Sequence, residues 1–260
     1  MIGVLVPAHD EEALIGDCLR SLQAAARCPG LAGEPVEVLV ALDSCTDGTA
    51  AVCAAHGVRT VALQARCVGR ARATAADVLL AMGARWIATT DADSRVPVDW
   101  LSAQLACGAD AFCGTVRVAD WLDFAPRVRA AFLAGERYED GHPHVHGANL
   151  GVSAAAYRAV GGFPPLAAHE DQALVAALAR DGFVLARRPH PAVVTSARRD
   201  ARARHGFGDY LLALEAAARG GAGPQGPGES AMSSPRAALS RSAGSGSSSV
   251  MRTLSGPSMR

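Results

Sequence analysis

The chain has 260 residues, half of them hydrophobic and 5% aromatic, which is enough for one good-sized α/β core with a segment left over. Its formal charge is zero, so a general basic surface for nucleic acid is not indicated. All basic residues are arginine, and the absence of lysine excludes lysine-based P-loops, Schiff bases and pyridoxal enzymes.

Several features indicate a cytoplasmic protein without a transmembrane segment. Seven scattered cysteines include no Cys-x-x-Cys pair, which favours reduced thiols over disulfides or a zinc cluster. Residues 2–7 are too short and uncharged for a signal peptide. No apolar stretch reaches the ~18–20 residues that cross a bilayer.

The first half of the chain alternates short apolar runs with helical patterns. Strands are expected at 2–6, 36–42, 58–63 and 86–90, and helices at 12–27, before Gly57 and at 70–82. This βαβα alternation with continuous apolar strands predicts an α/β fold, in which a mostly parallel central sheet is covered by helices on both faces.

After Asp93 the alternation is less regular. Helices are expected at 98–107, 124–138, 154–160, 171–180 and 210–218, and extended segments at 111–118, 149–152, 184–186 and 192–195. The domain is expected to span 1–219. Residues 220–260 are dominated by Gly, Ser and Pro with few apolar groups, which predicts a disordered tail.

Polar residues follow the predicted strands where ligands bind in open α/β sheets. Glu11 and Glu12 follow the first strand, where capping of the next helix is an alternative role. Asp43 follows the second strand and can accept from a base N–H or a ribose hydroxyl. Asp91 and Asp93 follow the fourth strand and can bind a hard divalent cation.

A further segment opens a helix, where the N-terminus favours anions. Gly69 permits close approach, and Arg70 can stack on a base or bind phosphate, whereas an ordinary surface position is favoured for Arg72.

Seven motifs in this order resemble the inverting family-2 glycosyltransferases of the GT-A fold. They are Val-Pro-Ala-His-Asp-Glu-Glu, Leu-Asp-Ser-Cys-Thr-Asp-Gly-Thr, Val-Gly-Arg-Ala-Arg-Ala, Thr-Asp-Ala-Asp, His-Gly-Ala-Asn-Leu-Gly, Val-Gly-Gly-Phe-Pro and His-Glu-Asp, between residues 6 and 171. The resemblance spans about residues 2–200. The first motif lacks the asparagine commoner in the family.

The resemblance implies a nucleotide-sugar donor, most often a UDP-sugar. Pro7, Ala8 and Glu11 would line the nucleoside pocket, with Asp43 holding the base and Arg70 beside it. In the Asp91-Ala92-Asp93 motif, Asp91 would approach the ribose and Asp93 would ligate Mg²⁺ or Mn²⁺ at the diphosphate, with Asp91 as a second candidate ligand.

The resemblance also implies a general base, and Asp171 occupies that position. Glu170 stands beside it, and pairing of both carboxylates with the helix dipole is the simpler alternative. The acceptor side would include Glu170 with His146, Gly147 and Asn149.

Other polar residues are ambiguous. His142, His144 and His146 would share one face of an extended segment, which makes a zinc triad conceivable, although no carboxylate can be assigned to it. Solvent exposure is favoured for His142. Arg198, Arg199 and His205 are candidates to reach the diphosphate or its cation.

Four alternatives differ in their sequence requirements. A haloacid-dehalogenase-like phosphatase would carry its Asp-x-Asp on the first strand and use a downstream lysine, and a nucleotidyltransferase would show a glycine-rich loop with lysine. Both conflict with this chain. A retaining GT-A enzyme and a non-catalytic sugar-nucleotide-binding protein stay open, because the fold does not fix the chemistry.

Overall fold

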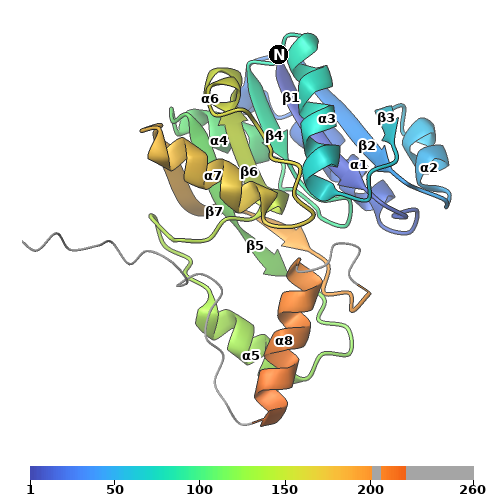
Figure 1. Ribbon diagram of the computed structural model, residues 1–260, viewed down its shortest axis with the longest axis vertical. Coiled ribbons are helices and arrows are strands. Elements are labelled where there is room, and N and C mark those ends of the chain that lie inside the picture. Colours follow the sequence, from blue (N-terminus) through green and yellow to red (C-terminus); the bar gives the residue numbers. More distant parts are fainter. Residues whose placement is uncertain (201–205, 221–260) are drawn as a thin grey trace, which may run out of the picture. The chain divides into compact units, whose positions relative to one another are not determined.

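A seven-stranded sheet organises the computed structural model, which describes residues 1–200 and 206–220 (Figure 1). The strand order is β3-β2-β1-β4-β6-β5-β7. The strands are β1 Ile2–Ala8, β2 Val36–Asp43, β3 Arg59–Leu63, β4 Trp86–Thr89, β5 Ala111–Val118, β6 Leu150–Ser153 and β7 Leu185–Thr195.

The predicted mostly parallel sheet is confirmed. Strands β3, β2, β1 and β4 are parallel neighbours, and β5 is parallel to β7. Only β6 is reversed, since it pairs antiparallel with both β4 and β5. The two short segments expected at 184–186 and 192–195 belong to one strand, β7, whose pairing with β5 shifts register between Gly114 and Val116.

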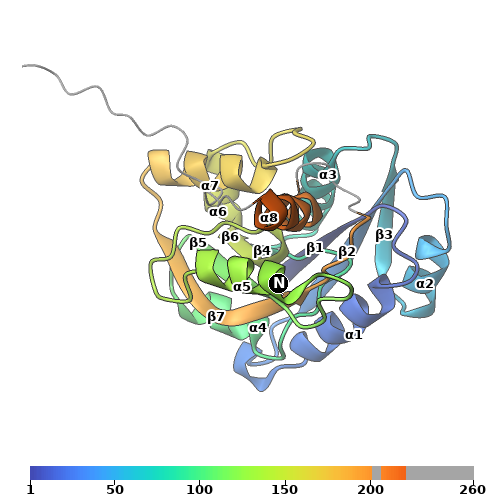
Figure 2. The same ribbon diagram turned by 90° about the horizontal axis from the view of Figure 1, so that it is seen from below.

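Helices cover both faces of the sheet, as predicted. They are α1 Ile15–Ala25, α2 Thr49–Ala55, α3 Val68–Ala81, α4 Trp100–Ala106, α5 Pro126–Gly135, α6 Ala154–Ala159, α7 Glu170–Arg180 and α8 Phe207–Gly220, with 3₁₀ turns η1 Pro29–Leu31 and η2 Gly147–Asn149. Figure 2 shows α1 and α4 on one side of the strands and α3, α6 and α7 on the other.

Alternation along the strands produces two cores, because successive side chains point to opposite faces. In β1, Val4 and Val6 pack with α1 and α4, whereas Leu5 packs with α3. Helix α1 supplies its apolar stripe at helical spacing, with Ile15 and Leu19 fully buried.

Helices α5 and α8 form a third, smaller cluster. The expected helix at 124–138 is shorter, since α5 begins at Pro126, where a proline is tolerated because a first-turn N–H has no helical partner. Phe132 of α5 is buried against Leu211 and Leu214 of α8, and its ring meets Trp121 edge-on at 5.4 Å.

This topology brings distant segments to one edge of the sheet. The carboxyl ends of the parallel strands β1, β2 and β4 lie on the same edge. Because β6 is reversed, its first residue, Leu150, pairs with Thr89 at the end of β4. The turn η2 therefore reaches the edge that carries the Asp91-Ala92-Asp93 motif.

All seven cysteines are free thiols, as expected. Among the described residues, none of the helices combines the length and apolar character needed to span a membrane. The predicted tail beyond Gly220 and the candidate residue His205 lie outside the described residues.

Candidate active site

Two acidic residues from two strand ends meet one arginine. Glu11 follows β1, Asp93 follows β4, and Arg198 follows β7. The guanidinium of Arg198 donates to both carboxylate oxygens of Glu11 at 2.5 Å, and its Nη2 lies 3.3 Å from Asp93 Oδ2. A two-way backbone pairing between Arg95 and Val194 holds the end of β7 beside the turn after β4, which explains why Arg198 reaches this site.

Asp93 is a poorly solvated acid. Burial raises its pKa to about 6, the charges of Asp91 and Glu11 add to this, and Arg198 opposes it. Its Oδ1 accepts weak hydrogen bonds from the hydroxyls of Ser94 at 3.2 Å and Thr195 at 3.4 Å. Protein groups therefore stabilise the negative charge of ionised Asp93 only in part.

The acidic residues Asp91 and Asp93 fit a hard divalent cation. Carboxylate oxygens are the donors that Mg²⁺ and Mn²⁺ prefer, and Mg²⁺ needs only one or two protein carboxylates because it keeps several waters. A cation would also favour the ionised form of Asp93, which its surroundings disfavour. The residues present are thus compatible with the metal that the sequence resemblance implies.

The surface position favoured for Arg72 is wrong. Its side chain is buried, its Nε donates to Thr89 Oγ1 at 3.2 Å and its Nη2 to Asp91 Oδ1 at 2.6 Å, while Nη1 pairs with Glu170. Arg72 precedes Ala75 and Leu79 by three and seven residues, so it shares their buried helix face. This spacing is the sequence signal that would have identified it.

The candidate base Asp171 is joined to this network through Gly147. A Cβ at position 147 would clash with the Arg72 guanidinium, so the close approach of these groups requires glycine. The Gly147 N–H donates to Asp171 Oδ2 at 2.6 Å, and the Gln172 N–H donates to Oδ1 at 2.8 Å. The structure thus connects Asp91, Arg72, Glu170, Gly147 and Asp171.

We expect Arg72→Met to lower the free energy of unfolding by about 3–5 kcal/mol, since breaking a buried pair leaves an uncompensated charge. The charge left behind is that of Glu170, which is 2% exposed. Urea unfolding monitored by circular dichroism measures the change. Arg180→Met is the matched control, because the exposed Arg180–Asp181 pair should contribute under about 1 kcal/mol. Equal losses in both variants would contradict this assignment.

Asp43 lies at the predicted edge but is occupied by protein contacts. Its carboxylate accepts the N–H groups of Ala65, Arg66 and Cys67 at 2.7–2.8 Å, and the Ser44 hydroxyl at 3.0 Å. Burial acts to raise the pKa of Asp43, but these donors outweigh it and the pKa is lowered. Asp43 therefore shapes the loop that leads into α3.

The other donor-side candidates lie around the same edge. Pro7 and Ala8 end β1, and Ala92 is buried between the two aspartates. Arg70 is exposed and borders a cavity of about 310 Å³ between the end of β3 and α3. Gly69 permits a close approach, as expected, but the group that approaches it belongs to the chain itself. The Gly69 N–H donates to Leu166 O at 3.0 Å.

Asn149, a predicted acceptor-side residue, is engaged inside the protein. Both amide hydrogens of the fully buried Asn149 are donated to Thr115 O and Pro191 O at 2.8 Å, and Oδ1 accepts from Trp100 Nε1 at 2.8 Å. Asn149 therefore ties η2 to β5 and β7. His146 precedes Gly147, and burial lowers its pKa to about 3.

Two further expectations are resolved by burial and ion pairing. The solvent exposure favoured for His142 is wrong, since this residue is 1% exposed and its Nε2 lies 3.1 Å from Arg188 O. Arg199 lies away from the acidic site and pairs with Asp123 and Glu215. Of the two arginines proposed to reach the diphosphate, only Arg198 is beside Asp93.

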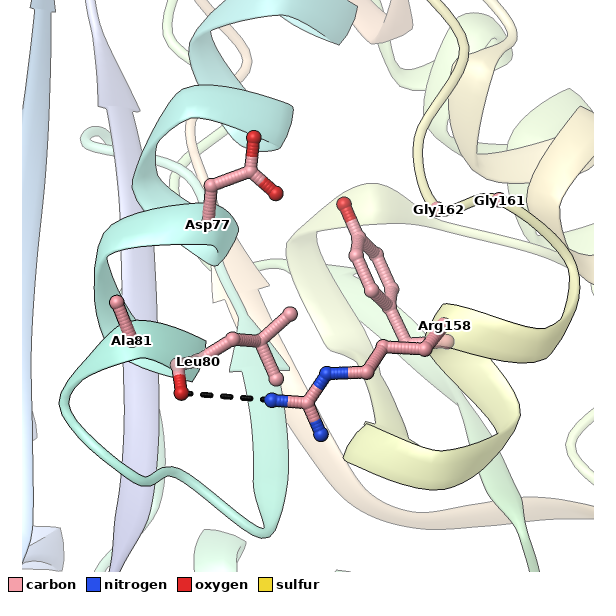
Figure 3. A pocket seen from close by; sticks show the side chains of 7 residues that line it. Asp77, Leu80, Ala81, Arg158, Gly161 and Gly162 are labelled. Carbon is pink, nitrogen blue, oxygen red and sulfur yellow. Dashed lines mark hydrogen bonds between the residues drawn. The ribbon is translucent and has the colours of Figure 1, made fainter.

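A cavity of about 410 Å³ lies between α3 and α6, on one face of the sheet (Figure 3). It is lined by Asp77, Leu80, Ala81, Tyr157, Arg158, Gly161 and Gly162. The Arg158 guanidinium donates to Leu80 O at 3.4 Å across it. None of the predicted site residues borders this cavity.

Residues 3–141 match the family Glycosyl transferase family 2. Among solved structures, S. aureus TarS in complex with UDP-GlcNAc is 16% identical over 86% of this chain and 68% of that chain, with a TM-score of 0.60. The mannosyltransferase PcManGT from Pyrobaculum calidifontis, in complex with GDP-Man and Mn²⁺, is 19% identical over 85% and 74%, with a TM-score of 0.58.

A third similar structure is glucosyl-3-phosphoglycerate synthase from Mycobacterium tuberculosis in complex with Mn²⁺, UDP and glucosyl-3-phosphoglycerate. It is 18% identical over 84% of this chain and 76% of that chain, with a TM-score of 0.55. The chain spans 66% and 37% of two further TarS structures. No curated protein sequence matches this chain.

The sheet order and these structural neighbours define the GT-A fold of glycosyltransferases, as predicted. The chain belongs to glycosyl transferase family 2, since the family match covers more than half of its length. The predicted family and enzyme class are thereby confirmed.

Proposed function

We propose that this chain is a metal-dependent inverting glycosyltransferase that moves a sugar from a UDP-sugar to an acceptor hydroxyl. The main support is the position of Asp91 and Asp93 at the carboxyl end of β4, connected through Arg72 and Glu170 to the segment that holds Asp171. Bound UDP-GlcNAc in TarS and bound Mn²⁺ with UDP in the glucosyl-3-phosphoglycerate synthase add support for the donor and the metal.

The donor would occupy the edge formed by β1, β2 and β4. Pro7, Ala8 and the loop shaped by Asp43 would border the nucleoside, with Arg70 beside its base. Ala92 and Asp91 would border the ribose. Arg198 would exchange its contacts with Glu11 and Asp93 for the diphosphate, because a guanidinium binds phosphate oxygens in the same forked geometry.

Asp93, with Asp91, would hold Mg²⁺ or Mn²⁺, which supplies Lewis-acid stabilisation for the negative charge of the departing nucleoside diphosphate. The chain's own cation near this charge is Arg198, whose pKa stays raised beside Glu11 and Asp93 despite its burial. Arg198 therefore stays protonated and can stabilise the leaving group electrostatically.

Asp171 would act as the general base. Its Oδ2 is fixed by the Gly147 N–H, and the carboxylate lies at the start of α7. The acceptor hydroxyl would attack the anomeric carbon, its proton would pass to Asp171, and the bond to the diphosphate oxygen would break. One displacement of this kind inverts the anomeric centre. Glu170, His146 and Gly147 would shape the acceptor side.

We expect UDP-sugars to raise the melting temperature of the full chain only when Mn²⁺ or Mg²⁺ is present. At a donor concentration of about 100 Kd the stabilisation should approach ~2.7 kcal/mol. Differential scanning fluorimetry with UDP- and GDP-sugars, with and without metal, measures this. GDP-sugars serve as the control for selectivity towards the uracil base of the donor. Equal stabilisation in chelator would contradict metal dependence, and no response to any nucleotide sugar would contradict the donor assignment.

We also propose a cytoplasmic location. All seven cysteines are free thiols, which suits a reducing compartment. Fractionation of cells that express the tagged chain tests this, with recovery in the cytosolic fraction as the expected result.

A further inference from the structure

Three imidazoles lie in a row beside a buried glutamate, outside the acidic site described above. His142, His144 and His146 alternate along an extended segment, and their rings stack with centroids 5.6 and 5.8 Å apart. Glu136 immediately follows α5 and approaches this row, with Oε2 3.7 Å from His144 Nε2. It supplies the carboxylate that the sequence could not assign.

The geometry of this cluster suits a bound cation. Ligand atoms of Glu136, His144 and His146 all lie within 4.8 Å of one another. Glu136 Oε2 and His146 Nε2 are buried and have no hydrogen-bond partner among the described residues. The Glu136 side chain is 4% exposed and that of His144 is 16% exposed. Unpaired buried polar atoms are costly, so two of them facing one space call for a ligand.

The segment that carries the histidines is held from outside. Arg187 of β7 donates through Nη1 to the backbone carbonyls of His142, Pro143 and His144, at 3.1–3.3 Å. The Arg137 N–H donates to His144 Nε2 at 2.9 Å, so this nitrogen carries a lone pair and not a proton. Binding of a cation by Nε2 would replace that hydrogen bond.

We propose that Glu136, His144 and His146 bind one transition-metal cation of the Zn²⁺ type, at a site separate from Asp91 and Asp93. Two imidazoles and one carboxylate are a ligand set that Zn²⁺ accepts, with further positions filled by water. Mg²⁺ prefers oxygen donors, so the two sites should differ in metal preference. This inference does not rest on the proposed transfer reaction.

Burial shifts the pKa values of all three proposed ligands. Burial lowers the pKa of His146 to about 3 and also lowers that of His144, where His142, Arg137 and Arg187 add to the effect. Burial alone raises the pKa of Glu136 to about 7.

The site adjoins the segment that positions Asp171. His146 is followed by Gly147, whose N–H donates to the Asp171 carboxylate. A cation bound by His146 would therefore fix the end of α5 and this segment together. Its role would be structural, because neither Glu136 nor His144 contributes a contact to the network that links Asp91, Arg72, Glu170 and Asp171.

Cobalt titration of the full chain tests the site directly. After treatment with chelator and exchange into millimolar Mg²⁺, we expect Co²⁺ to produce visible ligand-field absorption that saturates at one equivalent and is removed by Zn²⁺. Asp93→Asn should give the same titration, because Asp93 belongs to the other site. Absence of this absorption in the wild-type chain would overturn the proposal, whatever the behaviour of any variant.

Variants then identify the ligands. Glu136→Gln and His144→Gln should each weaken Co²⁺ binding by more than about tenfold, the lower limit for loss of even an outer-shell partner. His142→Gln is the matched control, since His142 belongs to the same row but not to the group of ligand atoms. Circular dichroism confirms folding. Unchanged affinity in folded Glu136→Gln and His144→Gln variants would place the metal elsewhere and overturn the assignment.

Discussion

Asp171→Asn is expected to lower the rate of sugar transfer by about 10²–10⁴-fold, the range that a positioned general base contributes. The amide oxygen can still accept the Gly147 N–H that now bonds Asp171 Oδ2 at 2.6 Å, and the exposed Gln172 N–H that now bonds Oδ1 can turn to water, so the local structure should survive. Asparagine cannot accept the proton of the attacking hydroxyl. Donor binding should be unchanged, because the donor contacts proposed for Arg70, Asp91 and Asp93 come from other segments.

Isothermal titration with UDP-sugar and Mn²⁺ measures donor binding, and product formation under saturating donor measures transfer. Asp181→Asn is the matched control at the other end of α7, where the side chain pairs with Arg180 at the surface. It should retain the wild-type rate. Transfer by Asp171→Asn at the wild-type rate would show that the base lies elsewhere, whereas loss of donor binding would mean that the variant damages the donor site.

Much of the fold was accessible from local patterns. The first four strands and the helices between them are continuous apolar runs and amphipathic segments, and their parallel pairing follows from the β–helix–β alternation. The reversal of β6 was not predictable, since residues 150–153 form a four-residue strand whose direction depends on pairing with β4 and β5. That reversal brings η2 to the site.

The site was predictable where it depends on strand ends and not where it depends on long-range pairing. Asp91 and Asp93 follow directly from the end of β4. The partnership of Arg198 with Glu11 joins residues 187 positions apart, and it depends on the long-range pairing of Arg95 with Val194. Arg72 differs, because its place on the buried face of α3 was readable from helical spacing.

The cluster of Glu136 with His144 and His146 was likewise predictable only in part. The alternation of the histidines predicted their shared face, and the ring stacking confirms it. The position of Glu136 depends on where α5 ends. The expected helix to residue 138 would have kept Glu136 helical, whereas α5 stops at Gly135 and Glu136 has an extended backbone. A three-residue difference in a helix boundary thus decides whether a carboxylate joins the row.

Asp93→Asn is expected to stabilise the metal-free chain at pH 7 while abolishing metal-dependent donor binding. The pKa of Asp93 is raised from 3.8 to about 6, chiefly by burial and then by Asp91. Because one pKa unit corresponds to about 1.4 kcal/mol, replacing the charged form by a neutral amide should gain up to about 3 kcal/mol. The same change removes the carboxylate proposed to ligate Mg²⁺ or Mn²⁺.

The two effects have different pH dependences. The folded chain binds the Asp93 proton more tightly than the unfolded chain, so wild-type stability falls as the pH rises from about 4 to about 6. Asp93→Asn should lack this contribution, and the difference between the two unfolding free energies should therefore grow across that window and level off above it. Conversely, stabilisation of the wild type by donor and Mn²⁺ should weaken below about pH 6, where Asp93 takes up a proton.

Thermal and urea unfolding at several pH values, with and without donor and Mn²⁺, measures both effects. The exposed Asp99, at the start of α4, provides the matched control as Asp99→Asn, which should change neither quantity. Equal pH profiles for wild type and Asp93→Asn in the absence of metal would contradict the buried, destabilised charge. Undiminished stabilisation of Asp93→Asn by donor and Mn²⁺ would instead contradict the role of Asp93 as a metal ligand. The charge of a carboxylate can be destabilised by burial whether or not that carboxylate binds the cation.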